Sequence, residues 1–137
     1  MPDADKTRVV VIDDDDSISD AIQLLVEMRG WEARTYRSCE AFIDGFDRND
    51  PPDCLVLDLH FKGMSGVELQ QSLAREGMTI PTVVLTAWPD SELSSMAAKA
   101  GAIEIMTKPA SSEQILQAIE NAVSQAAKSS TVPVRPA

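Results

Sequence analysis

Residues 9–16 read Val-Val-Val-Ile-Asp-Asp-Asp-Asp, so an unbroken apolar run ends directly in four carboxylates. A run without polar interruption is typical of a strand that helices cover on both faces, as in a parallel sheet. Residues 54–57 (Cys-Leu-Val-Leu) and residues 83–85 (Val-Val-Leu) form two more such runs. We therefore expect these three segments to be the central strands of a parallel sheet.

Two further segments carry the weaker pattern of edge strands. Residues 31–36 (Trp-Glu-Ala-Arg-Thr-Tyr) and 102–106 (Ala-Ile-Glu-Ile-Met) interleave polar with apolar side chains, as strands near the edge of a sheet tolerate. A segment long enough for a crossover helix follows each of the predicted strands, which are residues 8–12, 31–36, 54–57, 82–85 and 102–106. This alternation predicts an α/β fold, a doubly wound five-stranded parallel sheet of flavodoxin-like order 2-1-3-4-5 with helices on both faces.

Helix signals agree with this assignment. One apolar stripe at helical spacing consists of Ile18, Ala21, Ile22 and Leu25. Ser65 and Glu68 have the spacing of a capping box, which predicts that the third helix begins there. We expect Asp16 or Ser17 to cap the first helix.

The composition excludes several classes of function. The 137 residues carry a formal net charge of −10, which would repel nucleic acid and anionic lipid, so we expect this domain to bind neither directly. No apolar stretch is long enough to span a membrane, and the first residues lack the apolar region of a signal peptide, so the expected location is the cytoplasm. Cys39 and Cys54 lack metal or redox spacing and are expected to be ordinary thiols.

The composition changes near the carboxyl end of the chain. After about Ala127 the sequence contains two prolines and no apolar periodicity. We therefore expect a single domain at residues 7–127 and a flexible tail or the stub of a linker at residues 128–137.

Polar residues follow four of the predicted strands. These residues are Asp13 and Asp14 after the first strand, Asp58 after the third, Thr86 after the fourth and Lys108 after the fifth. Because the carboxyl ends of parallel strands meet at one edge of a sheet, we expect these side chains to lie together. Neighbouring carboxylates repel by about 4 kcal/mol per pair at an effective dielectric constant of about 20, so a cation must compensate them. Oxygen ligands favour Mg²⁺, with Mn²⁺ as a substitute.

The motifs as a set resemble the receiver domain of bacterial two-component response regulators, and within that family the receivers of the FixJ and NtrC type. The motifs that carry the resemblance are residues 9–14, 55–60, 63–69, 84–87 and 108–109. The resemblance implies a domain that is not an enzyme beyond slow self-catalysed phosphorylation and dephosphorylation. It also implies that phosphorylation switches a protein-interaction surface in two-component signal transduction, with transcription regulation as one outcome.

The resemblance also assigns roles to individual residues. Asp58 would accept the phosphoryl group from a sensor histidine kinase or a phosphotransfer protein. Asp13, Asp14, Asp58 and the backbone carbonyl of His60 would hold Mg²⁺. Thr86 would bind the phosphoryl group through its hydroxyl, and Lys108 would pair with it, following a cis peptide bond between Lys108 and Pro109.

The implied partners are the kinase or phosphotransfer protein and an output domain or target protein. In the family, the fourth helix, fifth strand and fifth helix, at about residues 90–127 here, often form the surface for the target or for a homodimer on activation. The chain would act alone or as the amino-terminal part of a longer DNA-binding regulator; the sequence leaves both alternatives open.

Four residues depart from the usual family pattern. Lys62 replaces a proline, and its charge either raises the affinity for the phosphoryl group or is simply solvated. Ile105 stands where the family usually has an aromatic residue that responds to activation, so Thr86 must be coupled in another way or weakly. Ala110 replaces a common aromatic residue after the Lys-Pro pair, which leaves that turn less anchored. Trp88 follows Thr86 by two residues, and we expect it either to shield the acyl phosphate from water or to pack against a partner.

Two alternative functions remain at this point. A pseudo-receiver would dock its partners without phosphorylation, as Ile105 permits. A phosphatase of the haloacid dehalogenase type would use Asp13 as its nucleophile and Asp15 as its acid, but this alternative leaves Asp58 without a role.

Overall fold

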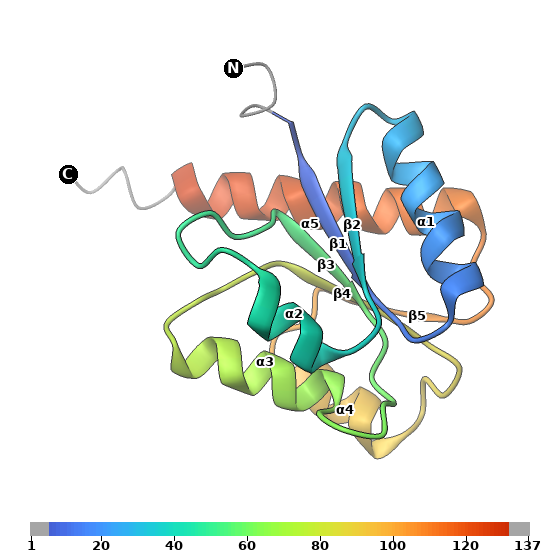
Figure 1. Cartoon of the computed structure of the whole chain (residues 1–137), viewed down its shortest axis with the longest axis vertical. Helices are drawn as coiled ribbons and strands as arrows, with labels where there is room; N and C mark the ends of the chain where they lie inside the picture. The colour runs from blue at the N-terminus through green and yellow to red at the C-terminus, as the bar shows by residue number, and fades with distance from the viewer. Residues whose placement is uncertain (1–5, 132–137) are drawn as a thin grey trace.

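The computed structural model describes residues 6–131, with side chains up to residue 125. Five parallel strands form one sheet in the order β2-β1-β3-β4-β5 (Figure 1). The fold class and the strand order predicted from the sequence are therefore confirmed. The elements are β1 (Arg8–Ile12), α1 (Asp16–Met28), β2 (Glu32–Tyr36), α2 (Cys39–Gly45), β3 (Cys54–Leu57), α3 (Gly66–Arg75), β4 (Thr82–Thr86), α4 (Glu92–Lys99), β5 (Glu104–Thr107) and α5 (Ser112–Thr131).

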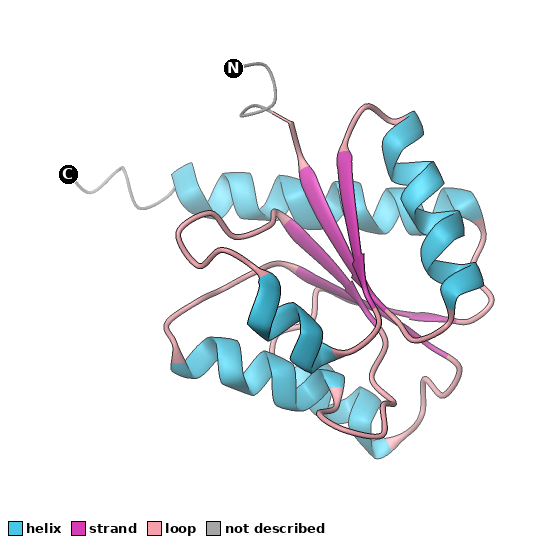
Figure 2. Cartoon of the chain, viewed as in Figure 1, coloured by secondary structure: helices cyan, strands magenta, loops and turns pink. Residues whose placement is uncertain are grey.

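The helices cover both faces of the sheet, α1 and α5 on one face and α2, α3 and α4 on the other (Figure 2). Side chains alternate along a strand, so neighbouring residues of β1 enter different hydrophobic clusters. Val9 and Val11 pack in the cluster that includes α1 and α5. Val10 and Ile12 pack in the cluster that includes α2, α3 and α4. The sheet thus separates two hydrophobic cores.

Burial along the strands matches the patterns in the sequence. All residues of β3 and β4 are buried, and so are four of the five residues of β1. The edge strands β2 and β5 are largely exposed or half-buried. Four strand ends differ from the prediction: β2 begins at Glu32 and β5 at Glu104, and β4 and β5 extend to Thr86 and Thr107, which are partners in the parallel register.

The ends of the helices required two corrections. Asp15, rather than Asp16 or Ser17, caps α1, since its carboxylate accepts hydrogen bonds from the N–H groups of Ser17 at 2.9 Å and Ile18 at 3.3 Å. Helix α5 continues to Thr131, so residues 128–131, which we expected in the tail, are helical; residues 132–137 lie outside the described residues. The capping box of Ser65 and Glu68 is present at the start of α3.

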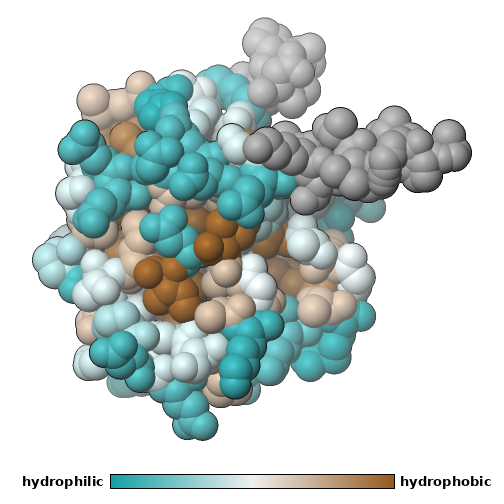
Figure 3. Space-filling model, turned by 180° about the vertical axis from the view of Figure 1, so that it is seen from behind, coloured by the Kyte–Doolittle hydropathy of each residue, from teal (hydrophilic) through white to brown (hydrophobic). Residues whose placement is uncertain are grey.

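Within the described residues, no helix combines the length and the apolar composition that a membrane span requires. Seen from behind, the molecule exposes mostly hydrophilic residues, with hydrophobic residues gathered near the middle of this face (Figure 3).

Candidate functional site

The pairing of β1 with β3 brings acidic side chains together at one edge of the sheet. Ile12 and Leu57 are partners in the parallel register, so the residues that follow them, Asp13 and Asp58, lie side by side. The N–H of Asp58 donates to the carbonyl of Ile12 at 3.0 Å. Asp13, Asp14 and Asp58 each offer a carboxylate oxygen, and these oxygens all lie within 4.8 Å of one another. The expected convergence at one edge of the sheet is therefore observed.

Lys108 reaches the same place from β5. The N–H of Lys108 donates to the carbonyl of Thr86 at 2.8 Å, which continues the pairing of β4 with β5 by one residue. Its Nζ lies 2.9 Å from Oδ2 of Asp13 and 3.3 Å from Oδ2 of Asp58. The Lys108–Pro109 peptide bond is cis, as the resemblance implied. The ammonium therefore bridges two carboxylates.

Burial and charge act against each other in this cluster. Asp13 and Asp58 are only 3% and 7% exposed, whereas Asp14 is exposed. Burial raises the pKa of Asp13, although the N–H of Asp15 and the ammonium of Lys108 oppose this shift. Burial lowers the pKa of Lys108, but its bond to Asp13 and the charge of Asp58 outweigh burial and raise the pKa overall. Lys108 therefore remains a cation.

The donor set of this cluster fits a hard divalent cation. With ionised side chains, three carboxylates and one ammonium leave two uncompensated negative charges. The clustered side chains offer oxygen ligands, which Mg²⁺ prefers. The backbone of His60 lies beside them, since its N–H reaches Oδ1 of Asp58 at 3.5 Å.

Thr86, the last residue of β4, and Trp88, in the loop that follows β4, border the site. Thr86 is fully buried, and its hydroxyl accepts a hydrogen bond from the N–H of Trp88 at 3.1 Å. The Trp88 side chain is 59% exposed, and its indole ring meets the His60 ring edge to face with centroids 4.8 Å apart. This contact joins the loop after β3 to the loop after β4 at the edge of the site.

The remaining departures from the family pattern have separate surroundings. Ile105 is partly buried and packs against the cluster that includes α2, α3 and α4. Ala110 lines a groove of about 360 Å³ between α1 and the start of α5, together with Ile18, Ala21 and Pro109. Lys62 is exposed.

Sequence reasoning missed two residues that shape the site. A Cβ on Gly66 would lie 2.5 Å from the carbonyl oxygen of Asp58, so only glycine lets α3 begin this close to β3. Glu40 accepts a hydrogen bond from the N–H of Met64 at 2.8 Å and so contacts the loop after Asp58. Gly66 lies within a quoted motif and could have been identified, but nothing in the sequence relates Glu40 to a loop more than twenty residues away.

A sheet of this order with an acidic cluster at its carboxyl edge is the architecture of signalling receivers. The family model of the response regulator receiver domain matches residues 9–120. The chain therefore belongs to the response regulator receiver domain family of two-component systems.

Similar proteins include two transcriptional regulators. The transcriptional regulatory protein TdiR of Thauera aromatica is 32% identical over 117 residues, which are 85% of this chain and 51% of TdiR. The transcriptional regulatory protein FixJ of Rhizobium meliloti (strain 1021) is 33% identical over 114 residues, which are 83% of this chain and 55% of FixJ. The chain thus spans about half the length of the curated relatives it matches.

Solved structures agree with this assignment. The crystal structure of FixJ-N matches with a TM-score of 0.79 and 32% identity, covering 87% of this chain and 94% of that one. The low-resolution structure of the response regulator StyR matches with a TM-score of 0.84 and 36% identity, covering 93% of this chain and 64% of that one.

Family membership favours the receiver interpretation over the phosphatase alternative raised by the sequence. Receiver domains are signalling domains that are generally not enzymes, and they bind Mg²⁺ at an acidic pocket. The phosphatase alternative is disfavoured, because its acid would be Asp15, whose carboxylate caps α1.

Proposed function

We propose that Asp58 accepts a phosphoryl group from a phosphohistidine on a sensor histidine kinase or a phosphotransfer protein. Asp13, Asp14, Asp58 and the backbone carbonyl of His60 hold Mg²⁺, for which Mn²⁺ can substitute. One observation carries the proposal: three carboxylates offer oxygens within 4.8 Å of one another, and the ammonium of Lys108 lies against two of them.

The proposed reaction transfers one phosphoryl group between side chains. A carboxylate oxygen of Asp58 attacks phosphorus, the new P–O bond forms as the P–N bond breaks, and the imidazole leaves with the electron pair. The N–H of Leu59, 2.7 Å from Oδ1 of Asp58, fixes the orientation of the carboxylate. Such a transfer requires alignment and neutralisation of charge more than it requires a protein base. Bound Mg²⁺ supplies part of that neutralisation.

Two residues of the chain respond to the new group. The ammonium of Lys108 moves from Oδ2 of Asp58 to a phosphoryl oxygen, which is a shift of hydrogen-bond partner. The hydroxyl of Thr86, which now accepts from the N–H of Trp88, turns to donate its proton to another phosphoryl oxygen. The backbone hydrogen bond between Lys108 and Thr86 links the two residues, so both changes occur at the ends of the paired strands β4 and β5.

The proposed output is a change in protein contacts. Phosphorylation replaces the single negative charge of the Asp58 carboxylate by an acyl phosphate of nearly −2, placed beside β4 and β5. The surface formed by α4, β5 and α5 then binds an output domain, a target protein or a second copy of the chain. The relatives TdiR and FixJ are transcriptional regulatory proteins about twice as long as the matched region, which supports an output domain and regulation of transcription. The expected location of this signalling is the cytoplasm.

Intact mass spectrometry tests the assignment of the phosphoacceptor. The parent protein and Asp58→Asn are incubated with acetyl phosphate and Mg²⁺, and a control contains a chelator. We expect one phosphoryl adduct in the parent with Mg²⁺, and none in Asp58→Asn or with the chelator. An adduct on Asp58→Asn, or a parent that remains unmodified, would contradict the proposal.

Size-exclusion chromatography of the same samples separates phosphorylation-dependent switching from docking by a pseudo-receiver. A switch changes the oligomeric state or the affinity for a partner when Asp58 is phosphorylated. A pseudo-receiver behaves identically with and without the phosphoryl group.

A further inference from the structure

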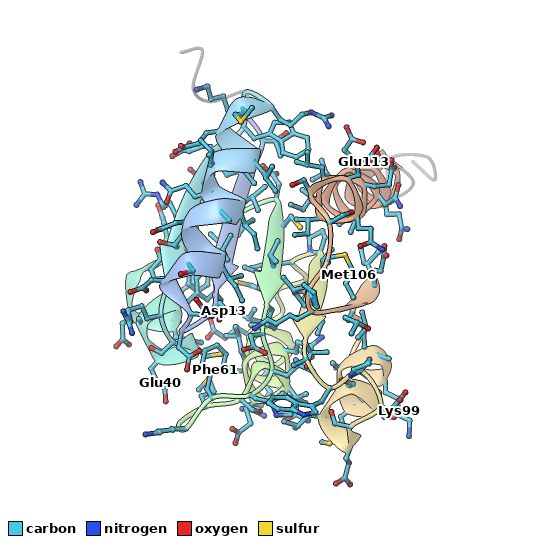
Figure 4. All side chains as sticks on the ribbon, turned by 90° about the vertical axis from the view of Figure 1, so that its right-hand side faces the viewer. Asp13, Glu40, Phe61, Lys99, Met106 and Glu113 are labelled. Atoms are coloured by element: carbon cyan, nitrogen blue, oxygen red, sulfur yellow. The ribbon has the colours of Figure 1, made fainter. Side chains whose placement is uncertain are left out.

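The loop between β3 and α3 is held from outside by a side chain of α2. Glu40 lies in the first turn of α2, and its Oε2 accepts a hydrogen bond from the N–H of Met64 at 2.8 Å. Figure 4 labels Glu40 and the loop residue Phe61 near each other, below Asp13. The contact joins residues that are 24 positions apart in the sequence. Because this hydrogen bond lowers the pKa of the Glu40 carboxyl, the acceptor remains a carboxylate.

The residue before Met64 is adapted to the same carboxylate. A Cβ on Gly63 would lie 2.2 Å from Oε2 and 3.1 Å from the carboxylate carbon of Glu40. The first distance is far shorter than any real contact between such atoms, so an alanine there requires the carboxylate to leave. The backbone of Gly63 therefore lies directly on the carboxylate of Glu40.

The two ends of this loop are fixed by other contacts. At its start, Oδ1 of Asp58 accepts the N–H of Leu59 at 2.7 Å. At its end, the N–H of Gly66 donates to the carbonyl of Leu59 at 3.1 Å, and the capping box begins α3 at Ser65. Glu40 acts on the segment between these ends, and that segment includes His60.

We propose that Glu40 is a positioning residue for the metal site, because its carboxylate fixes the loop that carries His60, whose N–H reaches Oδ1 of Asp58. This inference rests on the proposed function, in which the backbone carbonyl of His60 is a metal ligand. A ligand that is held in place before the metal arrives loses less conformational freedom on binding, so the affinity for the metal is higher. Glu40 then changes the affinity for Mg²⁺ and leaves the rate at saturating Mg²⁺ unchanged.

The experiment measures Mg²⁺ binding by isothermal titration calorimetry and phosphorylation by acetyl phosphate as a function of Mg²⁺ concentration. Loss of one solvent-exposed hydrogen bond predicts that Glu40→Ala raises the dissociation constant for Mg²⁺ by about three- to tenfold. The phosphorylation rate at saturating Mg²⁺ stays at the parent value. A reduced rate at saturation with unchanged affinity would overturn the proposal.

Two variants separate the hydrogen bond from the negative charge. Glu40→Gln keeps an oxygen that can accept from Met64 and removes the charge, so we expect an affinity close to that of the parent. Asp44→Asn removes a charge from an exposed position of the same helix, and we expect no effect. If Glu40→Gln weakens binding as much as Glu40→Ala does, long-range attraction rather than positioning explains the result, and the proposal is wrong.

A double-mutant cycle tests whether Gly63 acts through Glu40. Gly63→Ala alone displaces the carboxylate and is expected to weaken Mg²⁺ binding as Glu40→Ala does. In the Glu40→Ala background the added methyl group meets no carboxylate, so the double variant is expected to bind no more weakly than either single variant. Additive losses would overturn the proposal.

Asp13→Asn distinguishes failure of this inference from failure of the proposed function. If Asp13→Asn loses Mg²⁺ binding while Glu40→Ala binds as the parent does, the site stands and the role of Glu40 is refuted. If Asp13→Asn also binds as the parent does, the metal site itself is refuted, and the role of Glu40 with it. Circular dichroism of every variant verifies the fold.

Discussion

The replacement of Lys108 by methionine removes a cation from between two buried carboxylates. Methionine keeps much of the apolar stem, which lines the groove beside Ile18 and Leu85, so the main change is the loss of the ammonium. Without Mg²⁺, the charges of Asp13 and Asp58 then lack the partner that lies 2.9 Å and 3.3 Å from them. We expect Lys108→Met to destabilise the metal-free protein.

The distances give the size of the effect. At an effective dielectric constant of about 20, unit charges at these two separations attract by about 6 and about 5 kcal/mol. Desolvation of the ammonium offsets much of this attraction, and removal of one partner from a buried pair costs about 3–5 kcal/mol. Since the side of the cluster formed by Asp14 is open to water, we expect the free energy of unfolding to fall by about 2–4 kcal/mol.

Mg²⁺ replaces the missing charge in this variant. We therefore expect saturating Mg²⁺ to restore much of the lost stability. Each 1.4 kcal/mol of restored stability corresponds to a Mg²⁺ affinity about tenfold higher than that of the parent. Urea denaturation followed by circular dichroism, with Mg²⁺ and with a chelator, measures both quantities. Lys99→Met, at an exposed position in the last turn of α4, is the matched control.

The reasoning fails if Lys108→Met loses no more stability than Lys99→Met does. It also fails if the loss is the same with and without Mg²⁺, since the destabilisation would then have a cause other than uncompensated charge.

Three further predictions concern single side chains around the site and in the core. Trp88→Ala is expected to hydrolyse its phosphoryl group several-fold faster than the parent in a phosphate-release assay, and an unchanged rate would show that the indole does not shield the site. Gly66→Ala places a methyl group 2.5 Å from the carbonyl oxygen of Asp58 and is expected to lower the free energy of unfolding by about 1–3 kcal/mol and to slow phosphorylation; equal urea midpoints would refute this. Burial raises the pKa of Cys39 and of Cys54 to about 12, so a thiol reagent at neutral pH is expected to modify neither thiol before the protein unfolds, and rapid labelling of the native protein would contradict their burial.

The strands could be predicted because a strand that is buried on both faces contains apolar residues throughout, whereas an edge strand contains polar residues as well. Continuous apolar runs such as residues 54–57 identified the central strands, and the interleaved charges of residues 31–36 identified an edge. The end of α5 could not be placed in the same way. Residues 128–131 lack apolar periodicity, so the sequence does not mark where the helix ends.

The cap of α1 shows a different limit. Four consecutive aspartates and a serine offer equivalent capping groups, and the choice of Asp15 depends on where the backbone leaves β1. The gathering of Asp13, Asp58 and Lys108 followed from topology, because parallel strands end at one edge. The contact between the Lys108 ammonium and Asp13 did not follow, since it depends on the path of a side chain across the site.

The division of the interior by the sheet has a consequence for divergence within the family. Val9 and Val10 are adjacent in sequence, yet their packing partners lie on opposite sides of a single layer of backbone. A substitution at one of them demands compensating changes among helices that do not touch the other. A lineage can therefore remodel the side that carries α1 and α5 while the side that carries α4 keeps its ancestral packing.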